Sequence, residues 1–151
     1  MDQHLIPPSG HFEGSRHLFP VRVYFEDTDL SGVAYHANYL RWCERARSEI
    51  LRLLELNQRA AWDAGEGAYA VAEANLKYRR PARLGDALVI ETTATELRAA
   101  SVRLAQTIWR GEEMLADITI RLGFVAPDGR PRRQPPGWAA AFERFAAKDP
   151  E

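Results

Sequence analysis

The sequence contains only one cysteine, Cys43, which excludes an internal disulfide. It has neither a Cys-x-x-Cys pair nor a His-x-x-x-His pair, patterns that are typical of zinc sites, so we expect no metal and no other cofactor. Because unpaired cysteines are usual in reducing surroundings, we predict a cytoplasmic location. Cys43 itself is expected to be an inert thiol in the core.

The sequence also lacks an excess of charge and lacks long apolar runs. It holds 20 basic and 21 acidic residues, so no general field attracts nucleic acid or an anionic membrane. We therefore expect neither a nucleic-acid partner nor a membrane span, and the first residues do not have the pattern of a signal peptide. The 151 residues suit one domain, which we place at 17–147 after a flexible tail at 1–16.

Two hydrophobic periodicities dominate the first half of the chain. Residues 18–25 alternate apolar and polar side chains, which predicts a strand with one buried face. Residues 38–56 instead place apolar side chains at steps of three and four, which predicts an amphipathic helix with Asn38 as its N-cap. The apolar stripe consists of Tyr39, Cys43, Ala46, Ile50 and Leu53.

The second half reads as a run of strands joined by short turns. Strands are predicted at 69–78, 87–97, 101–109 and 114–125, followed by a short helix from 138 to about 147. Small residues at alternate positions of the first of these strands, Ala70, Ala72 and Ala74, predict that the long helix packs there.

This order of elements predicts an α+β domain, in which one long helix covers a five-stranded antiparallel sheet. Hairpin-sized connections make neighbouring strands antiparallel, and one helix can cover only one face. A sheet of this kind leaves an edge with unpaired backbone groups. We therefore expect a homodimer in which two subunits protect their edges.

The segment between the first strand and the helix is rich in groups that can do chemistry. Glu26, Asp27, Asp29 and His36 surround Gly32. Taken without its context, an Asp-Thr-Asp turn mostly caps local backbone amides, and we assign that structural role to Asp27 and Glu26. A carboxylate beside a helix start can equally serve as a catalytic group, and Asp29 is the candidate.

These residues and the element order resemble the hotdog-fold acyl-CoA thioesterases of the 4-hydroxybenzoyl-CoA thioesterase class. The resemblance is in particular to the bacterial branch associated with the Tol-Pal system. The resemblance rests on Glu26-Asp27-Thr28-Asp29, Gly32-Val33, Tyr35-His36, Glu44-Arg45-Ala46-Arg47 and Pro81-Ala82-Arg83-Leu84 followed by Asp86. It implies a long helix wrapped by an antiparallel sheet, assembly as a homodimer or homotetramer, and cleavage of thioesters at subunit interfaces.

The resemblance assigns roles to individual residues. Asp29 matches the catalytic aspartate, His36 matches the histidine of this branch, and the backbone amide of His36 matches the group that polarises the thioester carbonyl. The branch typically has a tyrosine just before its acidic motif, where this chain has Phe25. Any task of that hydroxyl passes to water or to Tyr24.

The chemistry of thioester hydrolysis suits such a turn, because free amides at a helix start can hold the negative charge that develops on the carbonyl oxygen. Asp29 either attacks the carbonyl to form a mixed anhydride or deprotonates the attacking water. His36 orients substrate or water, shares a proton with Asp29, or acts as the base itself. The motif does not separate these roles.

Other polar residues are assigned less specific roles. Tyr35, Arg79, Arg80 and Arg83 are candidate contacts for acyl-CoA, since arginine matches phosphate geometry, and the alternative is a solvated strand end. Glu44 and Arg47 are expected to support the helix. The histidines outside the motif, His4, His11 and His17, are expected at the surface.

The leading hypothesis is an acyl-CoA thioesterase, with acyl carrier protein or lipid-synthesis enzymes as possible partners. The alternative is a hotdog protein that binds acyl-CoA or acyl carrier protein without catalysis, because a fold alone does not establish activity. A dehydratase or isomerase acting on acyl-CoA is a third use of the fold. Release of thiol from acyl-CoA separates the first hypothesis from the second.

Overall fold

A six-stranded antiparallel sheet and one long helix form the body of the protein. The computed structural model describes residues 3–146. The strands are β1 (His11–Glu13), β2 (Arg16–Arg22), β3 (Ala68–Tyr78), β4 (Ala87–Leu97), β5 (Ser101–Arg110) and β6 (Glu113–Val125). Their order in the sheet is β1-β2-β4-β5-β6-β3. Between β2 and β3 the chain therefore crosses to the opposite edge of the sheet.

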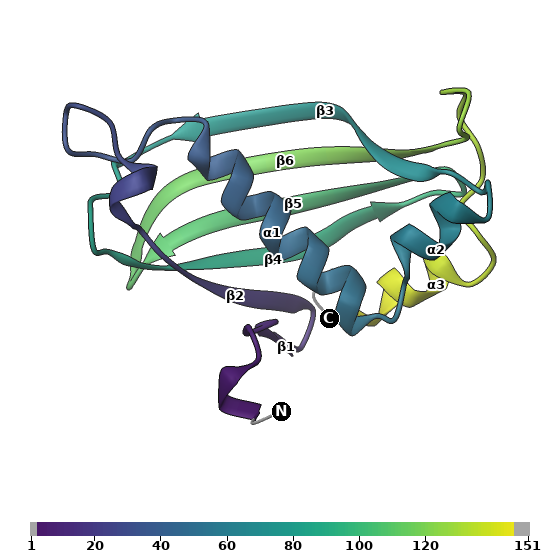
Figure 1. Ribbon diagram of the computed structural model, residues 1–151, viewed down its shortest axis with the longest axis horizontal. Coiled ribbons are helices and arrows are strands. Elements are labelled where there is room, and N and C mark those ends of the chain that lie inside the picture. The colour runs from purple at the N-terminus through teal and green to yellow at the C-terminus, as the bar shows by residue number, and fades with distance from the viewer. Residues whose placement is uncertain (1–2, 147–151) are drawn as a thin grey trace, which may run out of the picture.

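The long helix α1 (Asn38–Leu53) lies across one face of this sheet, as Figure 1 shows. It packs mainly against β2 and β4. Alternate residues of β5 and β6 point toward the helix and are almost completely buried, as the alternation in the sequence predicts. The arrangement is the predicted hotdog fold with one strand more than expected, because residues 11–13 pair with β2.

The predicted strands agree closely with the observed ones in the second half of the chain. The range of β4 is the predicted one, and β3, β5 and β6 differ from their predictions by one residue at an end. The prediction for the first strand was wrong at its end, because β2 stops at Arg22 and Phe25 begins a 3₁₀ turn, Phe25–Asp27.

The ends of α1 also differ from the prediction. Ala37 occupies the N-cap position, and the Asn38 side chain instead donates to the carbonyl of Asp27 at 2.7 Å. The helix stops at Leu53 because Glu55 adopts a left-handed conformation, with φ 61°. The amides of Glu55 and Leu56 then donate to the carbonyls of Arg52 and Leu51, which is a Schellman ending.

Two further helices were only partly predicted. The short helix α2 (Gln58–Asp63) was not predicted, although Asn57 caps it by accepting from the amide of Ala60 at 2.9 Å. Near the C-terminus, α3 (Trp138–Phe142) is followed by a 3₁₀ turn, Glu143–Phe145, which buries Phe142 and Phe145 in the core. The predicted end of this helix at residue 147 lies outside the described residues.

Strand β3 forms one edge of the sheet, and the prediction that its alanine face seats the helix was wrong. Ala70, Ala72 and Ala74 are exposed, and β3 pairs only with β6 among the described strands. A register irregularity between Val71 and Glu73 interrupts the pairing. The backbone of the outer side of β3 is therefore available to another strand.

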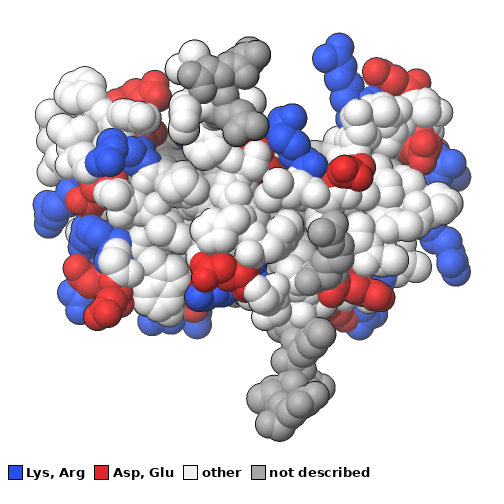
Figure 2. Space-filling model, turned by 90° about the horizontal axis from the view of Figure 1, so that it is seen from below, with Lys and Arg blue, Asp and Glu red and all other residues white. Residues whose placement is uncertain are grey.

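Charges of both signs are interspersed over the surface seen in Figure 2. Within residues 3–146 no helix is long and apolar enough to cross a membrane.

Candidate active site

The acidic segment forms a compact loop between β2 and α1. Thr28 and Ala34 form an isolated antiparallel bridge, and inside it the amide of Asp29 donates to the carbonyl of Val33 at 3.0 Å. The amide of Gly32 returns to the carbonyl of Asp29, also at 3.0 Å. Gly32 has φ 82°, a conformation that favours glycine, so the turn depends on this residue. Asp29 is thereby fixed at the base of a tight turn.

The carboxylate of Asp29 is exposed and ionised. Its Oδ1 accepts from the amide of Ser31 at 2.8 Å and from the Ser31 hydroxyl. These two bonds, and to a smaller extent the nearby His36, lower the pKa of Asp29 below its ordinary value. A carboxylate with these partners stays charged and keeps Oδ2 available as a base or nucleophile.

Asp27 has a different task two residues earlier, and it is the structural one that was predicted. Its side chain is buried, and its Oδ2 accepts from the amide of Tyr24 at 2.8 Å. Its carbonyl accepts from the amide of Tyr35 at 2.8 Å and from the side chain of Asn38. Asp27 therefore joins both ends of the loop to the first turn of α1.

His36 lies two residues before α1, with an exposed ring that contacts the tilted ring of Tyr35 at 4.4 Å between ring centroids. No backbone carbonyl within residues 3–146 accepts from the amide of His36 or from that of Ala37. The amide of Ala37, at the N-cap position, belongs to the unpaired set that a helix start carries, and the amide of His36 directly precedes it. The helix dipole adds partial positive charge there. The place predicted to polarise a carbonyl thus has free donors.

A hollow of about 280 Å³ lies beside this helix start. It brings together three residues predicted from the sequence, His36, Arg79 and Arg80. The other residues of its lining are Ala34, Tyr39, Tyr78 and Pro81. Asp29 and the predicted substrate contacts Tyr35 and Arg83 are not part of the lining.

The arginines of the predicted substrate set are already engaged with the protein. Arg79 pairs with Asp117 at 3.2 Å and Arg80 with Glu113 at 3.6 Å. Arg83 is joined to the loop between β2 and α1 through its backbone, which forms a bridge with Val33. All three arginines are exposed, so these surface pairs are weak enough to be exchanged for a phosphate.

Tyr78 is the site residue that the sequence did not identify. Its hydroxyl donates to the carbonyl of His36 at 2.7 Å. By contrast, Phe25, at the position where a tyrosine was expected, is 82% exposed. The position of Tyr78, at the strand end just before Arg79-Arg80-Pro81, was the available signal, but only the fold shows that this end meets the start of α1.

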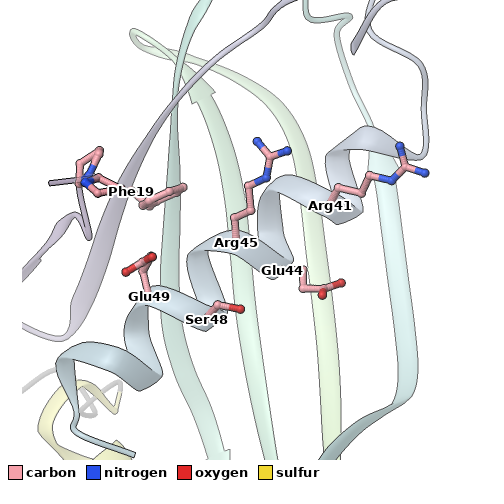
Figure 3. A pocket seen from close by; sticks show the side chains of 8 residues that line it. Phe19, Arg41, Glu44, Arg45, Ser48 and Glu49 are labelled. Atoms are coloured by element: carbon pink, nitrogen blue, oxygen red, sulfur yellow. The ribbon is translucent and has the colours of Figure 1, made fainter. Parts of the chain in front are cut away.

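A larger hollow, about 530 Å³, runs along the outer side of α1 (Figure 3). Figure 3 shows Arg45 and Glu49 on the side of Phe19, with Ser48 and Glu44 turned away from it. Glu49 accepts from Ser9 at 2.8 Å and from Arg52 at 3.1 Å, so it holds the N-terminal segment against the helix. None of the predicted site residues lines this hollow.

Of the remaining sequence predictions, two concern buried groups. Cys43 is buried, and burial raises its pKa to about 12, which fits an inert thiol. The prediction of a surface position was wrong for His17, which is fully buried.

The described residues contain no group of three His, Cys, Asp or Glu side chains that could hold a metal ion.

Comparison with known proteins identifies the family. A profile described as "Thioesterase superfamily" matches residues 31–116, which is more than half of the chain. The chain belongs to the thioesterase superfamily. Among other thioesterases, it is 40% identical over 107 residues to the acyl-CoA thioesterase YbgC of Haemophilus influenzae, covering 71% of this chain and 79% of that protein. It is 39% identical over 128 residues to the acyl-CoA thioester hydrolase YbgC of Escherichia coli O6:H1, covering 83% of this chain and 95% of that protein.

Solved thioesterase structures agree with this assignment. A probable thioesterase from Bartonella henselae is 36% identical and superimposes with a TM-score of 0.74, covering 80% of this chain and 99% of that one. A 4-hydroxybenzoyl-CoA thioesterase variant in complex with 4-hydroxybenzoyl-CoA superimposes with a TM-score of 0.76 at 20% identity, over 84% and 98% of the two chains. The second likeness supports the fold alone.

Proposed function

We propose that this thioesterase hydrolyses acyl-CoA to a free acid and coenzyme A, with Asp29 as the working carboxylate. The observation that carries the proposal is the ionised, exposed carboxylate of Asp29 on the turn that leads to the free amide of His36. Its family and the acyl-CoA thioesterase names of its relatives support the choice of substrate.

The proposed reaction places the thioester carbonyl oxygen at the amide of His36. That donor stabilises the negative charge that develops when the carbonyl carbon is attacked. Asp29 Oδ2 either forms the new bond itself, giving a mixed anhydride that water later cleaves, or removes a proton from a water that attacks. In both routes the carbon–sulfur bond breaks and coenzyme A leaves as a thiolate, which needs no strong acid to depart.

His36 is proposed as the second member of the site. Its ring is exposed beside the hollow and acts on Asp29 electrostatically. It orients substrate or water, or exchanges a proton with Asp29. We propose that Tyr35, Arg79, Arg80 and Arg83 contact the coenzyme A portion, with the arginines exchanging their carboxylate partners for phosphate.

The substitution Asp29→Asn tests the assignment. It keeps a side chain that can accept from Ser31 but removes the base and nucleophile, so turnover should fall by at least about 100-fold with the fold intact. Asp128→Asn is the matched control, because Asp128 accepts from the amide of Arg130 two residues later in the same way and lies far along the chain. Thiol release across short, long and aromatic acyl-CoA esters gives the readout.

Two outcomes contradict the proposal. Undiminished turnover in Asp29→Asn removes Asp29 from the chemistry. Saturable binding of acyl-CoA by the wild-type protein without thiol release favours the non-catalytic binding protein instead. A single turnover in heavy-oxygen water separates the two routes, since label enters the Asp29 carboxylate only if an anhydride forms.

The assembly and surroundings of the enzyme are also proposals. We propose a single catalytic domain at residues 17–147 that forms a homodimer or homotetramer. The open edge of β3, which ends at the hollow, supports this. Light scattering on the purified protein measures the assembly. The single cysteine supports a cytoplasmic location.

The resemblance to the Tol-Pal-associated branch supports proposing acyl carrier protein and lipid-synthesis enzymes as partners. A comparison of kcat/KM for acyl-CoA and for the same acyl group on acyl carrier protein tests the first of these. Equal or higher values with the carrier protein support the partnership, and a complete loss contradicts it.

A further inference from the structure

The hydroxyl of Tyr78 reaches the helix start from the end of β3. It donates to the carbonyl of His36 at 2.7 Å across 42 positions of sequence. Tyr78 is the last residue of β3, whereas His36 ends the catalytic loop. We propose that Tyr78 is a positioning residue, whose hydroxyl holds the His36–Ala37 peptide so that its amide faces the thioester oxygen together with the amide of His36.

The planarity of the peptide bond makes this contact effective. The carbonyl of His36 and the amide of Ala37 belong to one rigid trans plane and point in opposite directions. A hydroxyl that fixes the carbonyl therefore also fixes the direction of the Ala37 amide. The preceding plane is fixed in the same manner, because the carbonyl of Tyr35 accepts from the amide of Asn38 at 2.9 Å. The directions of the two free amides, those of His36 and Ala37, are thus fixed by hydrogen bonds to the carbonyls of their own peptide planes.

Packing holds the Tyr78 ring in the orientation that this bond needs. Its ring meets Tyr39 edge to face at 5.1 Å between centroids and meets the His36 ring at 6.4 Å. Tyr39 in turn is buried and accepts from the amide of Ala82 at 2.8 Å, so it is a rigid support. Desolvation by burial is the main cause that raises the pKa of Tyr78, which keeps the hydroxyl protonated and able to donate.

The position of Tyr78 also accounts for the phenylalanine at position 25. The Phe25 ring is almost entirely exposed and carries no hydroxyl, and Tyr24 is exposed as well. The tyrosine hydroxyl that touches the candidate site comes instead from β3, and it lines the hollow with His36, Arg79 and Arg80. Tyr78 therefore contributes orientation, while Asp29 contributes the reacting carboxylate.

The inference rests on the proposed function, and Tyr78→Phe tests it. This change removes one hydroxyl and keeps the ring. We expect kcat to fall about 10-fold with KM changed less than about twofold, because misdirecting a donor costs less than the 100- to 1,000-fold that follows its removal. The control is Tyr69→Phe, which removes another hydrogen-bonded hydroxyl from β3, where Tyr69 donates to Gln134 far from the site. That variant should lose thermal stability and keep its kcat.

A spectroscopic readout separates positioning from a merely structural role. The infrared band of a carbonyl-labelled acyl-CoA is recorded on the Asp29→Asn variant, where the ester survives, and on the double variant with Tyr78→Phe. We expect the polarised carbonyl band of the first to move back toward the free-ester frequency in the second. An unchanged band, or a Tyr78→Phe kcat within about twofold of wild type, overturns the inference while the proposed function stands.

The two proposals fail in different ways. If the wild-type protein binds acyl-CoA but does not hydrolyse it, the proposed function fails. The infrared carbonyl band of the bound ester, compared between the wild-type protein and Tyr78→Phe, then still decides whether Tyr78 is a positioning residue. If the wild-type protein binds no acyl-CoA, both are wrong.

Discussion

Ser31 donates twice to one oxygen of Asp29, once from its amide at 2.8 Å and once from its hydroxyl. The two bonds occupy Oδ1 and leave Oδ2 with its lone pairs free. They also favour the charged form of the carboxylate, which is the largest cause of the lowered pKa of Asp29. A residue within the turn thus lowers the pKa of the proposed catalytic group.

Ser31→Ala should shift the acid limb of the pH–rate profile to higher pH. Losing the hydroxyl removes the main cause that lowers the pKa of Asp29, so the carboxylate becomes protonated at a higher pH than in the wild type. The amide of Ser31 remains, and activity near neutral pH should change little. Profiles of kcat/KM measure the shift. Ser101→Ala, at the first residue of β5, serves as the control. An acid limb at the same pH in Ser31→Ala and the wild type contradicts the prediction.

His17 should make the protein less stable in mildly acidic solution. It is fully buried, its Nε2 donates to the carbonyl of Ser9 at 2.8 Å, and its Nδ1 has no partner within residues 3–146. Burial lowers the pKa of His17 below 6.5, and His11 adds to the shift, whereas the hydrogen bond to Ser9 and the charge of Glu49 oppose it. Below about pH 6.5 the unfolded chain therefore binds more protons, and the free energy of unfolding falls as the pH falls.

The variant His17→Gln checks this assignment. Glutamine keeps an N–H donor but does not titrate, so the slope of stability between about pH 6.5 and pH 5 should flatten. Urea unfolding at several pH values gives the slope. His11→Gln changes an exposed histidine of the same segment and should reduce the slope only slightly, because burial, and not His11, is the main cause that lowers the pKa of His17. An equal slope in wild type and His17→Gln excludes His17 as the cause.

Glu55→Gly should stabilise the protein by about 0.5 to 1 kcal/mol. Glu55 occupies the left-handed position of the Schellman ending of α1, where glycine has no steric cost. Removing a negative charge near the helix C-terminus adds a small favourable effect. Glu55→Gln measures that electrostatic part alone, and the difference between the two variants in thermal unfolding isolates the backbone part. A Glu55→Gly protein less stable than Glu55→Gln contradicts the argument.

Gln106 should be critical for the stability of the core. It is fully buried on β5, where its side-chain oxygen accepts from Arg47 at 2.9 Å. Its amide donates to the carbonyl of Cys43 at 3.1 Å and to Thr92 at 3.0 Å. Gln106→Leu leaves the half-buried guanidinium of Arg47 without this partner, which should cost about 2 to 4 kcal/mol.

Adding Arg47→Leu to Gln106→Leu removes both partners at once. The double variant should lose less stability than the sum of the two single losses, because no charge is left unpaired. Urea unfolding of the four proteins gives the coupling free energy. Strict additivity would mean that Arg47 and Gln106 contribute independently.

The strands of the second half could be predicted because their side chains alternate and two of their three turns carry glycine, Gly85 and Gly111. In β6 the residues Ala116, Ile118, Ile120, Leu122 and Phe124 are all buried, as their period of two requires. The loop between β2 and α1 was harder to predict. Asn38 is a residue type that often caps helices, yet its side chain donates to the Asp27 carbonyl 11 residues away. That contact exists only in the folded chain.

The remaining errors come from contacts distant in sequence. His17 is buried because the N-terminal segment folds over it, and Phe12 packs against its ring at 5.2 Å. The alanines of β3 are small, but the strand lies at the edge of the sheet and α1 lies mainly over β2 and β4. Tyr78 meets His36 only because the end of β3 lies beside the start of α1 in the folded chain. Local periodicity contains none of these three facts.

Asp27 and Asp29 are two residues apart and share no task. Asp27, with Asn38, binds the loop to the helix, whereas the carboxylate of Asp29 is bonded only to Ser31 within the described part of the chain. A side-chain replacement at position 29 therefore leaves the hydrogen bonds of Asp27 and Asn38 that hold the loop in place. Such a division lets natural selection exchange the reactive group, and with it the reaction, without first repairing the scaffold.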